Sequence, residues 1–429
     1  MIELISIVFI LGYLFIALEH VVNINKAASA LVTGVLCWAI FVLFSHSQTE
    51  FVYSELQHHL IHISEILFFL LGAMTIVELI DTHDGFRVIT DKINTISRVK
   101  LLWITSILAF FASAILDNLT TAIVMAALLP KLMKDKSDIW FFGGMIILAC
   151  NAGGAWSPIG DITTIMLWIG GQVSLDIIPS IFIPSVVCMV SPLIYLSFKI
   201  KGNVTPPNKV EKSKKTDEIV SIYERNFIFI SGVFSLLFVP VFKTITHLPP
   251  YMGMLLSLGV LWIATELLHK SKNYEHKSLL SVVNVLKKID TPTIYFFLGI
   301  LLAVSCLQSI GLLNDLADYL NNTIGNIYVI NLVIGLFSAI VDNVPLVAGA
   351  MGMYPIDEIG PFSKDGVFWE FLAYCAGTGG SVLIIGSAAG VAVMGILKID
   401  FIWYLKKISY LAFIGYVYGA LAYILLALI

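Results

Sequence analysis

The chain has 429 residues, of which 58% are hydrophobic and only 13% are charged, and its formal net charge is −4. Because soluble globular domains carry roughly 25% charged residues, this composition excludes an ordinary soluble domain. Apolar stretches of about 20 residues recur along the whole chain, which is the length needed to cross a bilayer. We therefore predict a polytopic membrane protein.

Ten stretches are predicted to cross the membrane as helices. They are residues 2–18, 26–44, 64–82, 139–170, 174–198, 226–246, 250–268, 291–310, 366–397 and 402–428. The first is not expected to be a signal peptide, because no Lys or Arg precedes it and no small-residue cleavage site follows. The five cysteines lie in apolar stretches and are interpreted as packing residues rather than disulfide partners.

The positions of Lys and Arg predict the topology. Apart from Lys26, they cluster within 87–100, 131–136, 199–225, 270–288 and 398–407. Cytoplasmic segments of membrane proteins are enriched in these residues. Placing the N-terminus outside puts every cluster in the cytoplasm and leaves only Lys243 and Lys364 outside.

The apolar segment 101–132 has basic residues at both ends, so it must leave the cytoplasmic side and return to it. At ~32 residues it is too short for two spans and too long for one straight helix. Polar residues interrupt it at 117–121. We predict a re-entrant helical hairpin over about 100–134 with its tip near mid-membrane, where broken backbone requires protein or water around it. A single kinked helix is the alternative.

An internal repeat relates the two halves of the chain. The motif Ser-Ala-x-x-Asp-Asn at 113–118 recurs 225 residues later at 338–343, and the glycines within 153–160 recur within 379–386. Such repeats are typical of secondary transporters. Since each half holds an odd number of spans, the halves are expected to be inverted. The second hairpin, about 326–355, should then enter from outside.

The predicted fold is therefore all-α, with two inverted repeats of five transmembrane helices and one re-entrant hairpin each. The first repeat covers 1–200, a cytoplasmic linker covers 201–225, and the second repeat covers 226–429. Glycine-broken helices are expected at about 139–170 and 366–397, where freed backbone groups bind substrate and coupling ion in transporters. The alternative is that these glycines only permit close helix packing.

Four acids are predicted to lie within the membrane, namely Glu78, Asp117, Asp161 and Asp342, and no Lys or Arg is expected near them. A lone intramembrane charge costs about 2.5–3.5 kcal/mol on insertion scales and is functional by default. Unpaired carboxylates repel anions, whereas hard cations prefer oxygen ligands. Oxygen donors in these segments are Asp117, Asn118, Thr120, Thr121, Asn151, Asp161, Thr163, Thr164, Ser338, Asp342 and Asn343. The pattern predicts a cation site.

A buried carboxylate that holds either H+ or Na+ exchanges one for the other, because burial favours its protonated form. We predict a secondary active transporter that exchanges Na+ (or Li+) for H+ by alternating access, with no enzymatic activity and no cofactor. The sequence contains no P-loop signature, which argues against a nucleotide partner, and nothing in it suggests a nucleic-acid partner. Two alternatives remain: a Na+-coupled symporter of an organic or inorganic anion, and a channel or non-transporting membrane protein.

These motifs, the run from Asn151 through Ser157-Pro-Ile-Gly-Asp161 to Thr164, and Glu78 in Thr-Ile-Val-Glu-Leu, resemble NhaD-type sodium/proton antiporters of the ion transporter superfamily. The resemblance covers essentially the whole chain. It implies two hairpins, two broken helices, a homodimer, elevator-like movement and a bacterial cytoplasmic membrane location. It carries functional roles to Glu78, Ser113, Asp117, Asn118, Asn151, Asp161, Thr163, Thr164, Ser338, Asp342 and Asn343, and more weakly to Ser381 and Ser387.

The repeats differ at two positions that matter for the ion. Asp161 aligns with Ser387, and Thr120 aligns with Pro345. We therefore expect Na+ or Li+ to be bound chiefly by Asp117 and Asp161, with Asp342 either closing the site or carrying a proton. Glu78 has an alternative interpretation as an acid at the membrane interface.

Two further features are predicted outside the site. His46, His58, His59 and His62 are expected in an external loop and His83 at a cytoplasmic helix end, either as pH sensors or as solvated residues. Residues 84–99 are expected to form an amphipathic helix on the cytoplasmic face.

Overall fold

The computed structural model describes residues 1–17, 19–45, 49–90, 93, 95–205, 220–270, 272–340 and 342–428. Within these ranges the regular secondary structure is helical, and the only β-type contacts are two isolated bridges. Nine of the described helices are long and apolar enough to cross a membrane. The prediction of a polytopic helical membrane protein is confirmed.

The first half of the chain forms ten helices in the described ranges. They are α1 (Ile2–Ala17), α2 (Glu19–Val22), α3 (Lys26–Phe44), α4 (Thr49–Thr82), α5 (Arg87–Thr90), α6 (Arg98–Leu116), α7 (Asn118–Leu132), α8 (Lys136–Ala155), α9 (Ile162–Ile169) and α10 (Ile177–Lys199).

The second half contributes twelve more. They are α12 (Ile222–Thr246), α13 (Pro250–Leu268), α14 (Tyr274–Leu280), α15 (Val282–Leu286), α16 (Thr291–Ser309), α17 (Leu312–Thr323), α18 (Ile327–Phe337), α19 (Asn343–Met353), α20 (Val367–Gly379), α21 (Ala388–Leu397), α22 (Phe401–Lys407) and α23 (Ser409–Ala427).

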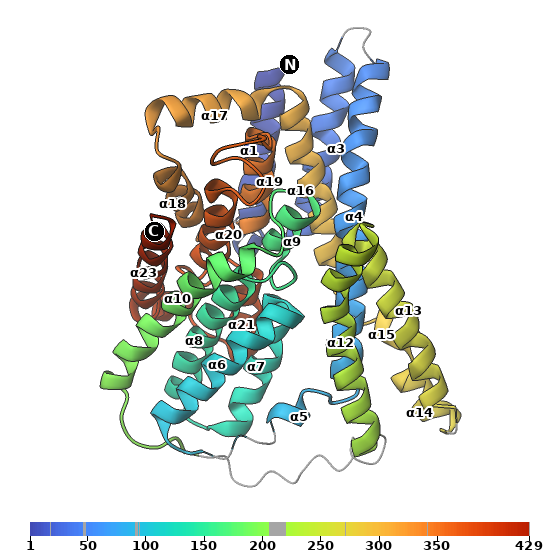
Figure 1. The fold of residues 1–429 in the computed structure, drawn as a ribbon, viewed down its shortest axis with the longest axis vertical. Helices are drawn as coiled ribbons and strands as arrows, with labels where there is room; N and C mark the ends of the chain where they lie inside the picture. The colour runs from blue at the N-terminus through green and yellow to red at the C-terminus, as the bar shows by residue number, and fades with distance from the viewer. Residues whose placement is uncertain are drawn as a thin grey trace.

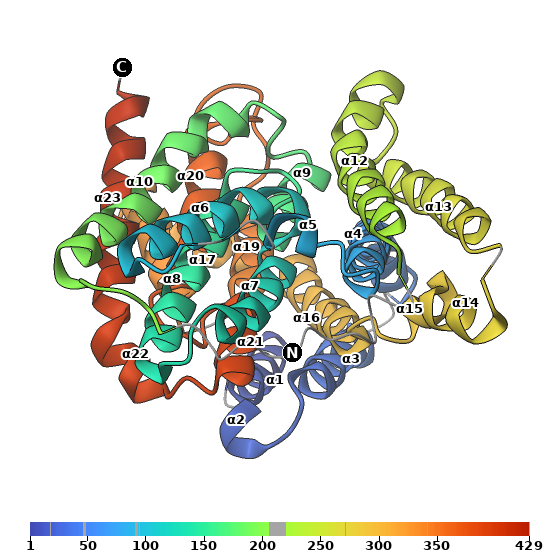
Figure 2. The same ribbon diagram turned by 90° about the horizontal axis from the view of Figure 1, so that it is seen from below.

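The helices pack into two groups, and each group draws on both halves of the chain. One group contains α1, α3, α4, α12, α13 and α16, and the other contains α6 to α10 with α18 to α23. Figure 2 shows α12, α13 and α4 on one side, and α23, α10 and α8 on the other. The groups touch through α16 against α19 and α4 against α9. The residues at these contacts therefore connect the two helix groups.

Two pairs of consecutive helices meet at the repeated Asp-Asn motif. α6 ends at Leu116 and α7 begins at Asn118, and the two helices pack together. α18 and α19 flank the second copy of the motif. In Figure 1, α6 and α7 lie in the lower half of the molecule, and α18 and α19 lie in the upper half. The two motif copies are therefore approached from opposite ends.

The predicted glycine-rich interruptions are present in both halves. The chain leaves helical structure between α8 and α9, and again between α20 and α21. A Cβ atom on Gly153 would lie 2.1 Å from the backbone oxygen of Phe110, and one on Gly379 would lie 1.9 Å from that of Gly335. Both distances are far inside van der Waals contact. These glycines therefore also permit the close helix packing that was the alternative explanation.

Helix α4 is much longer than predicted. It begins at Thr49 rather than near residue 64 and has 34 residues, which corresponds to about 50 Å at 1.5 Å per residue. The prediction of an external loop carrying His58, His59 and His62 is wrong, because these histidines lie on the N-terminal part of α4. His46 lies outside the described residues.

Two other predicted elements are corrected. The expected amphipathic helix over 84–99 does not form as one element. α5 covers four of its residues and 98–99 belong to α6, whereas 84–86, 93 and 95–97 are not helical and 91, 92 and 94 lie outside the described residues. The expected span 402–428 is divided, because α22 ends at Lys407 and α23, the helix long enough to span, begins at Ser409. α22 is also bent from α21 by 115°. Most of the predicted linker, residues 206–219, also lies outside the described residues.

Candidate functional site

Four helices begin at side chains that cap their free backbone N–H groups. Asp117 caps α7, Asp161 caps α9, Asp342 caps α19 and Ser387 caps α21. The first N–H groups of a helix have no partner within it and carry partial positive charge. A carboxylate in this position is stabilised without any Lys or Arg. The acids at the helix breaks are therefore compensated by helix termini, which the sequence analysis did not foresee.

Asp161 is almost fully buried and lies at the centre of one hydrogen-bond network. Its Oδ1 accepts hydrogen bonds from the backbone N–H of Thr163 at 2.8 Å and from the Thr163 hydroxyl at 2.7 Å. Its Oδ2 accepts a hydrogen bond from the amide of Asn118. This contact joins the start of α9 to the start of α7.

Asn151, near the end of α8, connects this network to the second half of the chain. Its Oδ1 accepts from Asn118 at 3.3 Å. Its Nδ2 donates to the hydroxyls of Ser381 and Ser387, each at 2.9 Å. The two serines, which only the weaker part of the resemblance suggested, are therefore brought into contact with the predicted site.

Asp117 lies between α6 and α7, and both of its carboxylate oxygens accept hydrogen bonds from Thr120. Oδ1 accepts from the Thr120 backbone N–H and Oδ2 from its hydroxyl, both at 2.8 Å. The Asp117 backbone has φ +84° and ψ 158°, a region that residues with a side chain rarely adopt. Such strain is typical of functional positions and of ligand-binding turns.

The remaining predicted polar residues lie at or beside the helix breaks. The Ser113 hydroxyl donates to the Cys150 carbonyl at 2.6 Å, and the Ser338 hydroxyl donates to the Ala376 carbonyl at 3.0 Å. These equivalent bonds tie α6 to α8 and the end of α18 to α20. Thr164, Thr121 and Asn343 are buried nearby, and the buried hydroxyl of Thr121 has no hydrogen-bond partner among the described residues.

A cavity of about 410 Å³ opens beside Thr120. Its polar and charged lining residues are Glu19, Asn25, Lys26, Glu78, Asp81, Thr120, Lys288, Asp290 and Thr293. Thr120 also lines a smaller cavity of about 30 Å³ that contains Asp117. With four carboxylates and two ammonium groups, the larger cavity has an excess of negative charge, and such a cleft concentrates cations.

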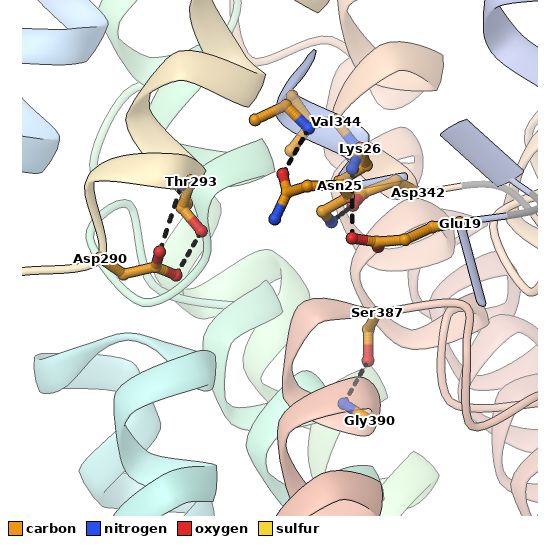
Figure 3. Close-up of polar contacts among 10 residues, drawn as sticks. Glu19, Asn25, Lys26, Asp290, Thr293, Asp342, Val344, Ser387 and Gly390 are labelled. Carbon is orange, nitrogen blue, oxygen red and sulfur yellow. Dashed lines mark hydrogen bonds and ion pairs between the residues drawn. The ribbon is translucent and has the colours of Figure 1, made fainter. Parts of the chain in front are cut away.

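The expectation that no Lys or Arg accompanies the acids is wrong at two positions. Lys26 Nζ lies 2.9 Å from Asp342 Oδ2, and Lys288 Nζ lies 3.6 Å from Glu78 Oε1. Figure 3 shows Lys26 beside Asp342 and Glu19. The sequence placed Lys26 in a short loop, whereas the fold brings the start of α3 against the start of α19. Glu78 faces the cavity and is not bonded to the Asp161 network.

The three predicted Na+ or Li+ ligands are not gathered around one point in this conformation. No group of three or more His, Cys, Asp or Glu side chains in the described part of the chain could hold a metal ion. Asp161 shares the Asn118 and Asn151 network, Asp117 bonds to Thr120, and Asp342 bonds to Lys26. The joint role of the three acids stays a prediction.

Comparisons with known proteins identify the family. The model of the citrate transporter family (CitMHS) matches residues 13–369. "Sodium/proton antiporter 1" of Arabidopsis thaliana is 46% identical over 98% of this chain and 71% of its own length. "Sodium/proton antiporter 2" of the same plant is 42% identical over 98% of both chains. "Na(+)/H(+) antiporter NhaD" of Vibrio cholerae is 32% identical over 98% of this chain and 91% of its own.

The chain therefore belongs to the CitMHS family and, within it, is an NhaD-type relative of the sodium/proton antiporters. This confirms the resemblance inferred from the Asp-Asn motifs and the Asn151–Thr164 run.

Proposed function

We propose that this protein exchanges Na+ (or Li+) for H+ across the cytoplasmic membrane. The observation that carries the proposal is a pair of acids, the half-buried Asp117 and the buried Asp161, each capping a helix that begins at a break and each accepting a hydrogen bond from a threonine hydroxyl. The names of the relatives, from plants and from Vibrio, support the same activity.

The site favours a cation over the anion that the family description suggests. Free helix N-termini bind anions readily. Here the N-termini of α7, α9 and α19 are already occupied by the chain's own carboxylates, and that of α21 by Ser387. The adjoining cavity has twice as many acids as bases. A polycarboxylate such as citrate would be repelled by the three carboxylate caps and by the excess of acids in the cavity.

Exchange follows from competition for the same oxygens. Hard cations bind carboxylate, amide and hydroxyl oxygens, which Asp117, Asp161, Thr163, Asn118 and Asn151 supply. A carboxylate that has taken a proton no longer attracts Na+, so the two ions displace one another. The cavity beside Thr120, with Glu78 on its wall, is the proposed entry path on one side of the membrane.

We propose that the fold consists of two inverted repeats, 1–200 and 226–429, each with one re-entrant hairpin. Equivalent contacts in the two halves support this: Ser113 bonds to α8 as Ser338 bonds to α20. The placement of α6 and α7 opposite α18 and α19 in Figure 1 agrees with inversion. The group with both hairpins would move past α1, α3, α4, α12, α13 and α16 in alternating access, in a homodimer with the N-terminus outside.

The test is Na+-induced proton movement in everted membrane vesicles from a bacterial host that lacks its own sodium/proton antiporters. The vesicle interior is acidified by respiration, NaCl or LiCl is added, and the pH gradient is followed with a fluorescent amine. We expect both salts to dissipate the gradient, and potassium citrate to leave it unchanged. No response to Na+ or Li+ at neutral or alkaline pH would refute the proposal.

The site is tested in the same vesicles with single carboxylate neutralisations. Asp117→Asn and Asp161→Asn are each expected to abolish exchange without lowering the amount of protein in the membrane, because each removes a titrating oxygen pair. Asp315→Asn on the exposed face of α17 is the matched control and should exchange like the wild type. Normal exchange in either site variant would remove that acid from the mechanism.

A further inference from the structure

Lys26 is the first residue of α3, and its position is defined by the helix cap next to it and by three contacts of its own. Asn25 caps the helix by accepting from the Ala27 N–H at 2.9 Å. The Lys26 backbone N–H donates to Glu19 at 3.1 Å. Its ammonium donates to Asp342 Oδ2 at 2.9 Å and lies 4.3 Å from the centre of the Phe296 ring. A lysine held by a carboxylate and an aromatic face is a built contact rather than a solvated loop residue.

The two partners belong to different helix groups. α3 packs on α16 and α4, whereas Asp342 caps α19, which packs on α9 and α20 of its own group and meets the other group at α16. The side chains of Lys26 and Asp342 are 27% and 14% exposed, so the ion pair is shielded on most sides. It adjoins a small cavity that both residues line and the large cavity that Lys26 lines. Figure 3 shows this pair above the start of α21, where Ser387 bonds to Gly390.

The acids are distributed unequally between the two halves. The first half has Asp117 and Asp161 at its two helix starts, while the second half has Asp342 and Ser387. Asp342 is the one acid among the two second-half caps, and it is the residue that pairs with Lys26. Among the described residues, no Lys or Arg forms an ion pair with Asp117 or Asp161, whose hydrogen-bond partners are hydroxyls, amides and helix N–H groups.

We propose that Lys26 is the dedicated counter-ion of Asp342. It neutralises this carboxylate, so Asp117 and Asp161 alone exchange Na+ and H+, and it attaches the start of α19 to the helix group that contains α3. This role rests on the proposed antiport. Two exchanging carboxylates release at most two protons when one Na+ binds. A third carboxylate without a counter-ion would add a negative charge to the site that neither Na+ nor H+ neutralises.

The test is a charge-balanced double variant, because removing one partner of a shielded ion pair leaves the other charge unpaired. Lys26→Gln and Asp342→Asn are each expected to lower the initial exchange rate about tenfold, a typical coupling for residues in contact. Lys26→Gln/Asp342→Asn keeps the net charge and a side-chain hydrogen bond. This double variant should regain most of the lost exchange rate. Its half-saturating Na+ concentration should equal that of the wild type.

Lys26→Arg, which keeps the positive charge, should retain more exchange than Lys26→Gln. All rates are normalised to the amount of monodisperse protein extracted from the vesicles. A charge-swapped variant, Lys26→Asp/Asp342→Lys, gives a second measure of recovery if the amide pair folds poorly.

Each outcome is decisive. If the double variant is as inactive as Asp342→Asn alone, Asp342 itself binds the transported ions and the proposal is wrong. If Lys26→Gln exchanges like the wild type, the ion pair has no functional role. If the wild type itself shows no response to Na+ or Li+, the proposed antiport fails first and the role of Lys26 fails with it.

Discussion

Replacing Asn151 by Ala provides a demanding test of the hydrogen-bond network between the two halves. Asn151 is completely buried, and its amide makes three hydrogen bonds, to Asn118, Ser381 and Ser387. A buried hydrogen bond between neutral groups contributes about 1 kcal/mol net. Loss of all three would weaken the arrangement that holds Asn118 against Asp161 by about 3 kcal/mol. Asn151→Ala is therefore expected to raise the half-saturating Na+ concentration by about 100-fold, at tenfold per 1.4 kcal/mol.

The measurement is the initial rate of pH-gradient dissipation in everted vesicles over a range of NaCl concentrations. Ser381→Ala removes one of the three bonds and should raise the half-saturating concentration about fivefold. Asn151→Ala/Ser381→Ala should match Asn151→Ala alone, because the bond between them is already lost.

Asn331→Ala is the matched control for removing a buried amide. Asn331 is also completely buried, lies on α18, and donates to the Phe368 carbonyl at 3.1 Å. Its loss should lower the thermal stability of the purified protein but leave the half-saturating Na+ concentration unchanged. The reasoning is refuted if Asn151→Ala leaves that concentration at the wild-type value, or if Asn331→Ala raises it equally.

Two further predictions concern stability in detergent, measured by thermal unfolding. Gly153→Ala is expected to destabilise the protein by about 1–3 kcal/mol or more, because its Cβ would lie 2.1 Å from a backbone oxygen of α6. Gly395→Ala, with open space around its Cβ, should be neutral or slightly stabilising. Equal effects of the two substitutions on stability would contradict the packing. His83 and His269, just beyond the ends of α4 and α13, are buried with their Nε2 atoms 3.3 Å apart, and burial lowers the pKa of His83 from 6.5 to about 4 and the pKa of His269 below its usual value. The unfolded chain takes up these protons near pH 6.5, whereas the folded chain does not. The stability of the protein should therefore be full above pH 6.5 and fall progressively toward pH 4. An equally steep fall of stability with pH in His83→Gln would contradict this assignment.

Much of the site could be predicted from residue types and spacing. Asn118, Asn151, Asp161 and Thr163, which belong to the recognised motifs, lie in one hydrogen-bond network, whereas Asp117 bonds to Thr120. Such residues are recognisable because polar groups are costly in an apolar chain and stand out from their surroundings. The contacts of Ser387 with Asn151 could be suggested only weakly, since they depend on how two broken helices pack.

Other errors have identifiable physical causes. The length of α4 was underestimated because its N-terminal turns carry polar residues and histidines that a membrane-length window interprets as loop. The amphipathic pattern over 84–99 did not produce a continuous helix, since helix formation also requires backbone partners that short connectors do not supply.

The sequence by itself determined that this is a helical membrane protein with a repeated Asp-Asn motif, glycine-interrupted helices and a family membership. Those features are encoded locally, in composition, in runs of about 20 apolar residues and in recurring short motifs. Only the tertiary structure decided which charges meet. Lys26 and Asp342 are 316 residues apart, and hydropathy and the positive-inside rule carry no information about a contact that forms only when α3 packs beside α19.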